Sequence, residues 1–129
     1  MSILLTVAAG LTFGIGFLHS VLGERYIVGR LLRRDDLPKL FGDDVFTRRT
    51  IRFAWHLTSL AWWGLGGVLL AVAFAPTGQV VGWVIAVVSF TFLVSAALTA
   101  GASRLRHLAW VVFLSIAALA AIAYARWAG

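Results

Sequence analysis

A long stretch without charge constrains this chain more than any other feature. Between Arg52 and Arg104 the sequence contains no Asp, Glu, Lys or Arg. This stretch is longer than the roughly 20 apolar residues that one transmembrane helix needs. Residues 76–79 (PTGQ) divide it with the Pro and Gly that are typical of a tight turn. The stretch therefore predicts two transmembrane helices joined by a short connection.

Two further apolar runs flank this pair, and each is long enough to cross a hydrocarbon core of about 30 Å. A content of 61% hydrophobic and 12% charged residues excludes a water-soluble domain of ordinary composition. We therefore predict an all-α integral membrane bundle of four transmembrane helices in a single domain of residues 1–129. The expected spans are residues 3–22, a run from before residue 51 to residue 75, residues 80–100 and residues 108–124.

The distribution of Lys and Arg predicts the orientation. Every basic residue except Arg126 falls within residues 24–52 or residues 101–107. Cytoplasmic segments of membrane proteins carry the excess of Lys and Arg, so both segments are expected in the cytoplasm and both termini outside. The same rule explains the net charge of +6, which favours anionic lipid headgroups over nucleic acid as the partner.

The longer cytoplasmic segment is expected to be partly helical. Residues 25–34 mix apolar and cationic side chains, a pattern typical of a helix lying in the membrane interface. Pro38 disfavours helix at the residue before it, so this helix is expected to end there. Asp43 and Asp44 then offer an N-cap for a helix that begins at Val45 and continues into the membrane.

Small residues recur at helical spacing and predict close helix contacts. They suit packing within one bundle and a homo-oligomer interface equally well, and both alternatives stay open. The residues concerned are Gly10, Gly14, Gly67, Ala71, Ala117, Ala121 and Ala125.

The histidines are the main functional signal. All three of them, His19, His56 and His107, fall within about two helical turns of the predicted cytoplasmic boundary. In a compact four-helix bundle their side chains would converge. Three neutral imidazoles with an open fourth position suit zinc, iron or copper. The sequence thus predicts a metal site formed by these three residues, with metal-dependent enzyme chemistry or metal handling as its use.

Polar groups near the histidines would orient the ligands. The predicted second helix carries a polar stripe at steps of three or four residues, which must face protein or water. Ser20 and Glu24 form an i, i+4 pair about 100° around the first helix from His19, which makes Glu24 the weaker partner. The stripe is Arg49, Arg52, His56, Ser59 and Trp63, and the orienting groups are Ser20, Glu24, Arg52 and Ser59.

Several alternatives compete with the metal site. His19 and His56 would also suit a b-type haem with Arg52 on a propionate. A channel or transporter would use the histidines as a gate, and a structural subunit would only hydrogen-bond them, a role that fits His107 best. The absence of cysteine removes thiolate chemistry. Tryptophans are expected mainly to anchor helices at the interfaces, namely Trp55, Trp62, Trp63, Trp83, Trp110 and Trp127.

Three segments resemble those of a group of uncharacterised small four-helix bacterial inner-membrane proteins. They are residues 17–25 (FLHSVLGER), 52–59 (RFAWHLTS) and 106–110 (RHLAW), and the likeness extends over nearly the whole chain. The resemblance implies a bacterial inner membrane. It implies no activity.

Overall fold

A computed structural model describes the backbone of residues 2–128 and the side chains of residues 3–125, so the side chains of Arg126 and Trp127 lie outside the described part. The described chain is all-α, as predicted. Its elements are α1 Ser2–Gly23, a π-helical turn Glu24–Val28, α2 Gly29–Leu31, α3 Val45–Phe74, a 3₁₀ turn Thr77–Gln79, α4 Val80–Ser103 and α5 Ala109–Ala128.

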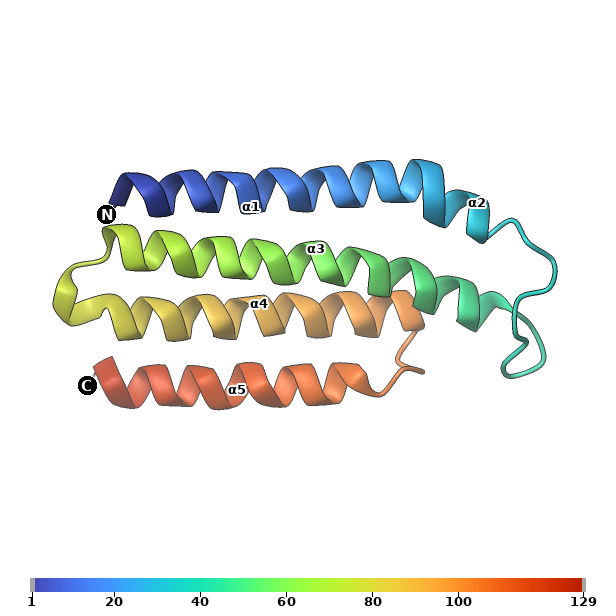
Figure 1. The fold of residues 1–129 in the computed structure, drawn as a ribbon. Helices are drawn as coiled ribbons and strands as arrows, with labels where there is room; N and C mark the ends of the chain where they lie inside the picture. The colour runs from blue at the N-terminus through green and yellow to red at the C-terminus, as the bar shows by residue number, and fades with distance from the viewer. Residues whose placement is uncertain (1, 129) are drawn as a thin grey trace.

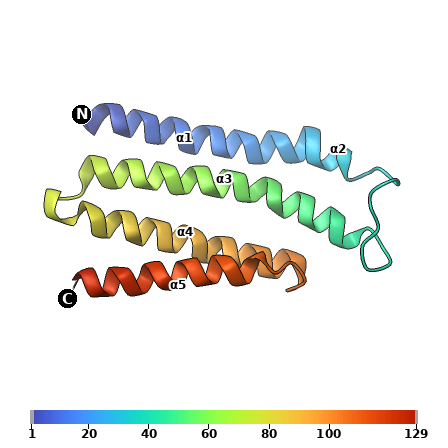
Figure 2. The same ribbon diagram turned by 60° about the horizontal axis from the view of Figure 1, so that its bottom comes forward.

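The long helices lie side by side in a row rather than in a closed bundle. The extensive contacts are α1 with α3, α3 with α4, and α4 with α5, and Figures 1 and 2 show this order from two directions. Both termini lie at one end of the row, together with the turn between α3 and α4. The expectation of a compact bundle was wrong, because α1 and α5 occupy the two edges.

Three of the helices are long and apolar enough to cross a membrane, which indicates a multi-pass membrane protein. They are Ile3–Leu31, Val45–Phe74 and Thr77–Ser103, whereas the apolar part of the last helix, Ala109–Ala125, is shorter. At 1.5 Å per residue the first two reach about 45 Å, which exceeds a hydrocarbon core of about 30 Å. These two helices therefore extend beyond the core.

Residues 25–34 do not form a separate interfacial helix. The π-helical turn follows Gly23 without a break and leads directly into α2, so the helix continues as far as Leu31, with α2 displaced to one side of the α1 axis. The physical reason is visible at Gly29, whose N–H donates to Glu24 O and carries the helical bonding across the turn. The predicted interfacial helix is thus the projecting end of α1.

Helix α3 begins at Val45, as the sequence predicted. Asp43 Oδ1 accepts a hydrogen bond from the Val45 N–H at 3.1 Å, so Asp43 is the capping side chain. Asp44 instead pairs with Arg48 one turn later, at 2.5 Å. The Arg48 guanidinium donates a hydrogen bond to the Asp44 carboxylate. This bond favours the ionised form and so lowers the pKa of the Asp44 carboxyl.

Glycines let α1 approach α3 closely at two points. A Cβ on Gly16 would lie 2.5 Å from Trp63 Nε1, and a Cβ on Gly23 would overlap the ring of Trp55. Each indole also donates to a backbone carbonyl of α1, Trp63 to Phe13 O at 3.1 Å and Trp55 to His19 O at 3.0 Å. These two tryptophans join helices, so the expectation that they mainly anchor the interface was wrong for them.

Four of the small residues predicted to make close helix contacts divide into two groups. Gly67 faces α4, where a Cβ would contact Val87 at 3.0 Å, and Ala117 is buried against α4. A Cβ on Gly10 or Gly14 would meet nothing within 4 Å, so these glycines do not serve the contacts between the described helices.

Candidate functional site

Six polar side chains of α1, the turn after it and α3 meet in the half of these helices that is nearer the 32–44 connection. We call this set the polar cluster; it consists of His19, Ser20, Glu24, Arg52, His56 and Ser59. At its centre, Ser20 Oγ lies 3.0 Å from His56 Nδ1 and 2.9 Å from Ser59 Oγ. Ser59 is buried and 1% exposed. The centre of the cluster is therefore shielded from solvent and lipid by the two helices.

His19 closes one end of the polar cluster. Its Nδ1 lies 3.1 Å from Ser59 Oγ. The imidazole is stacked on Trp55, with ring centroids 4.4 Å apart and planes at 3°, and Trp62 packs against it at 4.9 Å. Because Trp55 also bonds the His19 carbonyl, one indole fixes both the backbone and the ring of this histidine.

Glu24 closes the other end. One carboxylate oxygen lies 3.3 Å from His56 Nε2, and the other accepts from Arg52 Nε at 3.0 Å. The Glu24 and His56 side chains are each 36% exposed, so this end reaches the surface. The sequence predicts that Glu24 is the weaker partner, because the pair of Ser20 and Glu24 lies about 100° around the helix from His19. In the structure Glu24 is a central partner, because it contacts His56 on α3.

The polar cluster has two consistent sets of hydrogen-bond directions. In one, His19 Nδ1–H donates to Ser59, Ser59 to Ser20, and Ser20 to His56 Nδ1, while His56 Nε2–H donates to Glu24. In the other, His56 is protonated on both nitrogens and donates to Ser20 and Glu24, and the two hydroxyls donate in the reverse direction to a bare His19 Nδ1. With a proton on His19 Nε2 in both sets, His19 is an imidazolium in the first set and neutral in the second. The two sets then contain the same number of protons and differ by one proton moved between the imidazoles along the hydroxyls.

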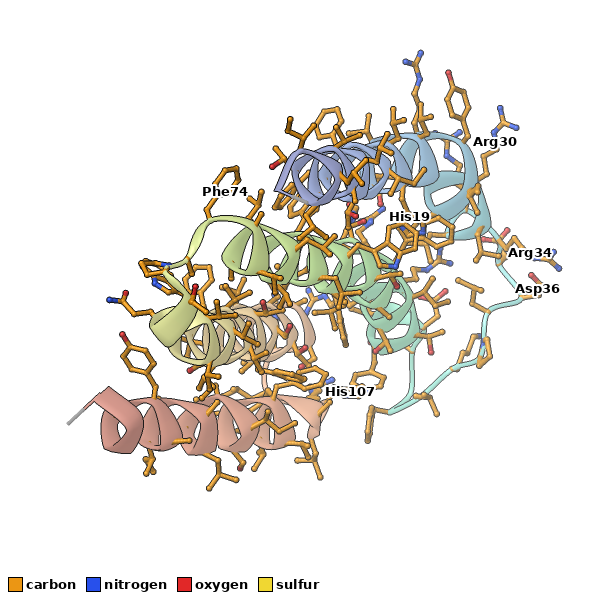
Figure 3. All side chains as sticks on the ribbon, turned by 60° about the vertical axis from the view of Figure 1, so that its left-hand side comes forward. His19, Arg30, Arg34, Asp36, Phe74 and His107 are labelled. Carbon is orange, nitrogen blue, oxygen red and sulfur yellow. The ribbon has the colours of Figure 1, made fainter. Side chains whose placement is uncertain are left out.

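His107 does not join the other two histidines. It precedes α5 and lies against α3, with Phe46 at 6.3 Å and Phe53 at 5.5 Å between ring centroids. Its Nδ1 accepts from the Ala109 N–H at 3.3 Å, which caps the first turn of α5. Figure 3 shows His19 beside α3 and His107 beside α5. The structure gives His107 a helix-capping position.

The donor set does not fit the predicted metal centre. Among the described residues no three His, Cys, Asp or Glu side chains are grouped to hold a metal ion. In the polar cluster both ring nitrogens of His56 face other protein groups. A haem between His19 and His56 does not fit either, because Ser20 and Ser59, which lie between them, touch at 2.9 Å. That contact leaves no space for a macrocycle.

The predicted stripe on α3 lies against α1 or the turn after it for four of its five residues. His56 and Ser59 bond to α1 side chains and Trp63 bonds to the α1 backbone, whereas Arg52 pairs with Glu24 in the turn directly after α1. Arg49 instead borders two grooves next to the end of α4. Trp55 was missed as a site residue. The signal for it was Gly23, which follows His19 by one helical turn and leaves space for a large ring.

Comparison with protein-family models, curated proteins and solved structures finds no match for this chain. Its function must therefore be argued from its own residues and their geometry.

Proposed function

We propose that the chain is a four-span protein of a bacterial inner membrane, with both termini outside and the 32–44 connection in the cytoplasm. Two observations support this topology. The basic residues gather in the segments at one end of the row, and the N- and C-terminal ends lie together at the opposite end. Helix α5, with 20 residues, has the length of a fourth span.

Within this topology, the polar cluster acts as an acid–base site that transfers a proton at the cytoplasmic boundary. The observation that carries the proposal is the unbroken hydrogen-bonded series from His19 through Ser59 and Ser20 to His56 and Glu24. Histidine is suited to proton transfer near neutral pH. A carboxylate beside the second imidazole stabilises the imidazolium that receives the proton.

This function accounts for the site better than the alternatives. Ionisable residues inside a membrane are costly and mark functional sites by default, and a purely structural contact would need neither a second histidine nor Glu24. A transmembrane proton channel would need polar groups along the whole span. The polar cluster instead lies in the half of α1 and α3 nearer the 32–44 connection and does not extend through the other half, so the transfer is local and serves chemistry or sensing on the cytoplasmic side.

Histidine nitrogen NMR on protein labelled with ¹⁵N tests the proposal, because the chemical shifts report which ring nitrogen carries a proton. Near neutral pH we expect one of the two Nδ1 atoms that face the hydroxyls, that of His19 or that of His56, to carry a proton, and not both. Ser20→Ala should break this exclusive relation. Ser115→Ala is the matched control, since Ser115 bonds only to Val111 O in its own helix.

Two results would overturn the proposal. One is an Nδ1 proton on both histidines at once near neutral pH, because the hydroxyls then could not connect them. The other is a stoichiometric metal in protein purified without a histidine tag, because a metal ion takes the imidazole lone pair that the proton transfer needs. The second result would favour the metal-binding alternative after a rearrangement of the side chains.

A further inference from the structure

A second polar feature lies on the other side of His56, between α3 and the end of α4. It is a groove of about 500 Å³ with several arginines in its walls. We call it the arginine groove; the cationic residues that matter are Arg49, Arg52 and Arg104, and the apolar ones are Phe53, Leu98 and Ala102. A neighbouring groove of about 360 Å³ also includes Arg49 and Arg104. These two arginines therefore stand between the two hollows.

Two of the cations lack an acidic partner. Arg52 pairs with Glu24 and Arg48 with Asp44. Among the described residues, by contrast, no ion pair includes Arg49 or Arg104. Arg49 is only partly exposed. A partly buried guanidinium without a counter-charge is costly, so this position favours an anion from outside the chain.

The backbone conformation of Arg104 also supports an anion site. Arg104 has φ +51° and caps α4 in the left-handed conformation, a position that usually carries glycine. Arginine is more strained there than glycine. Strained residues of this kind cluster at functional sites. Glycine would relieve the strain but has no guanidinium to bind an anion.

The position of the groove identifies the class of ligand. Arg52 and Arg104 are the charged residues that border the uncharged stretch of the sequence, so the groove lies where headgroups meet hydrocarbon. Its apolar wall includes Leu98, which is 45% exposed, and so suits an acyl or prenyl chain beside the anion. Two unpaired arginines match the two negative charges of a phosphomonoester better than the single charge of a phosphodiester.

We infer that the arginine groove binds the phosphomonoester headgroup of an anionic membrane lipid. This site is separate from the proton transfer assigned to the polar cluster, although His56 borders both. Ser20→Ala therefore leaves lipid binding unchanged, and failure of one proposal does not entail failure of the other.

Native mass spectrometry of the full chain in detergent at pH 8, with matched phosphatidic acid and phosphatidylglycerol, tests the inference. We expect phosphatidic acid to bind at least about tenfold more tightly, since hydrogen bonds to charged groups dominate such sites. Inorganic phosphate should bind far more weakly than the lipid. Equal binding of the two lipids overturns the inference, and equal binding of phosphate assigns the groove to a soluble ligand instead.

Variants locate the site. Arg49→Gln and Arg104→Gly should each weaken phosphatidic acid binding about tenfold. Arg104→Gly also removes backbone strain at φ +51°, so it should raise the melting temperature while binding falls. A higher melting temperature together with weaker lipid binding shows that the variant has lost binding and not its fold.

Two further variants complete the test. Gly101 borders the groove, and a Cβ there would meet nothing within 4 Å, so Gly101→Leu should block binding without disturbing the fold. Arg33→Gln removes an exposed charge outside the groove and should leave binding unchanged. An equal loss in Arg33→Gln would mean diffuse attraction to a basic surface and would overturn the inference.

Discussion

The two edges of the row are held in different ways. At one edge, α1 and α3 are joined by the polar cluster and by two indoles that bond to backbone carbonyls. At the other edge, α4 and α5 meet mainly through small and apolar residues, and Ser89 Oγ donates to Ala117 O at 2.9 Å. Since lipid is as apolar as a helix face, apolar packing alone discriminates weakly between partners in a membrane. The specificity of helix pairing is therefore concentrated at the edge formed by α1 and α3.

The largest expected effect comes from filling the space that Gly23 leaves for Trp55 in the contact between α1 and α3. Gly23→Leu places a side chain where the Trp55 ring lies, so α1 and α3 must separate. We expect a loss of about 3 kcal/mol in the free energy of unfolding, measured by denaturation in mixed micelles. Gly14→Leu is the control, because a Cβ at Gly14 meets nothing within 4 Å. Equal losses in both variants would contradict the observed α1/α3 contact.

Removal of the central imidazole should have the next largest effect. His56→Ala leaves Glu24 and Ser20 without their shared partner, and unsatisfied polar groups cost about 1–3 kcal/mol. We expect a loss of about 2 kcal/mol in the same assay. His56→Ala combined with Ser20→Ala should cost less than the sum of the single variants. Strict additivity would mean that the two side chains do not interact.

At the edge formed by α4 and α5, a comparable substitution should lower the free energy of unfolding less. Ser89→Ala removes the hydroxyl that bonds Ala117 O across the α4/α5 contact. Hydrogen bonds between membrane helices average about 0.6 kcal/mol, and we expect a loss of that order. A loss as large as that of His56→Ala would remove the contrast between the two edges.

The smallest effect concerns pH and the loop before α3. The Arg34 guanidinium, bonded to Asp36 at 2.8 Å, lowers the pKa of that carboxyl from 3.8 to about 2. A carboxyl with a lowered pKa in the folded state stabilises it above the ordinary pKa, and this contribution is lost as the pH falls toward 2. Between about pH 4 and pH 2 we expect smaller protection factors for amide exchange, that is, less slowing relative to the intrinsic rate at each pH, in residues 32–44. Asp36→Asn should abolish this pH dependence, and persistence of the dependence would assign it to another group.

The sequence predicted individual helices better than their arrangement. Charge-free length and turn residues located α3 and α4, and Asp43 marked the start of α3. A helical stripe also identified the face of α3 that carries His56 and Ser59. Periodicity cannot say which helix covers such a face, because lipid and neighbouring helices are equally apolar. The row was therefore missed, and with it the separation of His107 from the other histidines.

The candidate site was predicted in part for the same reason. His19, Ser20, His56 and Ser59 were singled out and lie together. Glu24 was underrated because its position was judged against its own helix, whereas its partners lie on α3. Trp55 was missed because a tryptophan near a membrane boundary is usually an anchor, and only the glycine opposite it indicates a contact.

Disulfide trapping in native membranes tests the central claim, that the polar cluster joins α1 to α3, most directly. The chain has no cysteine, so Ser20→Cys with Ser59→Cys provides the only thiols. Their hydroxyl oxygens lie 2.9 Å apart, within reach of a disulfide after a small adjustment. We predict rapid cross-linking of this pair and none for Gly14→Cys with Ser115→Cys, which lie on the opposite edges. Failure of the first pair to cross-link while the second does would contradict the account.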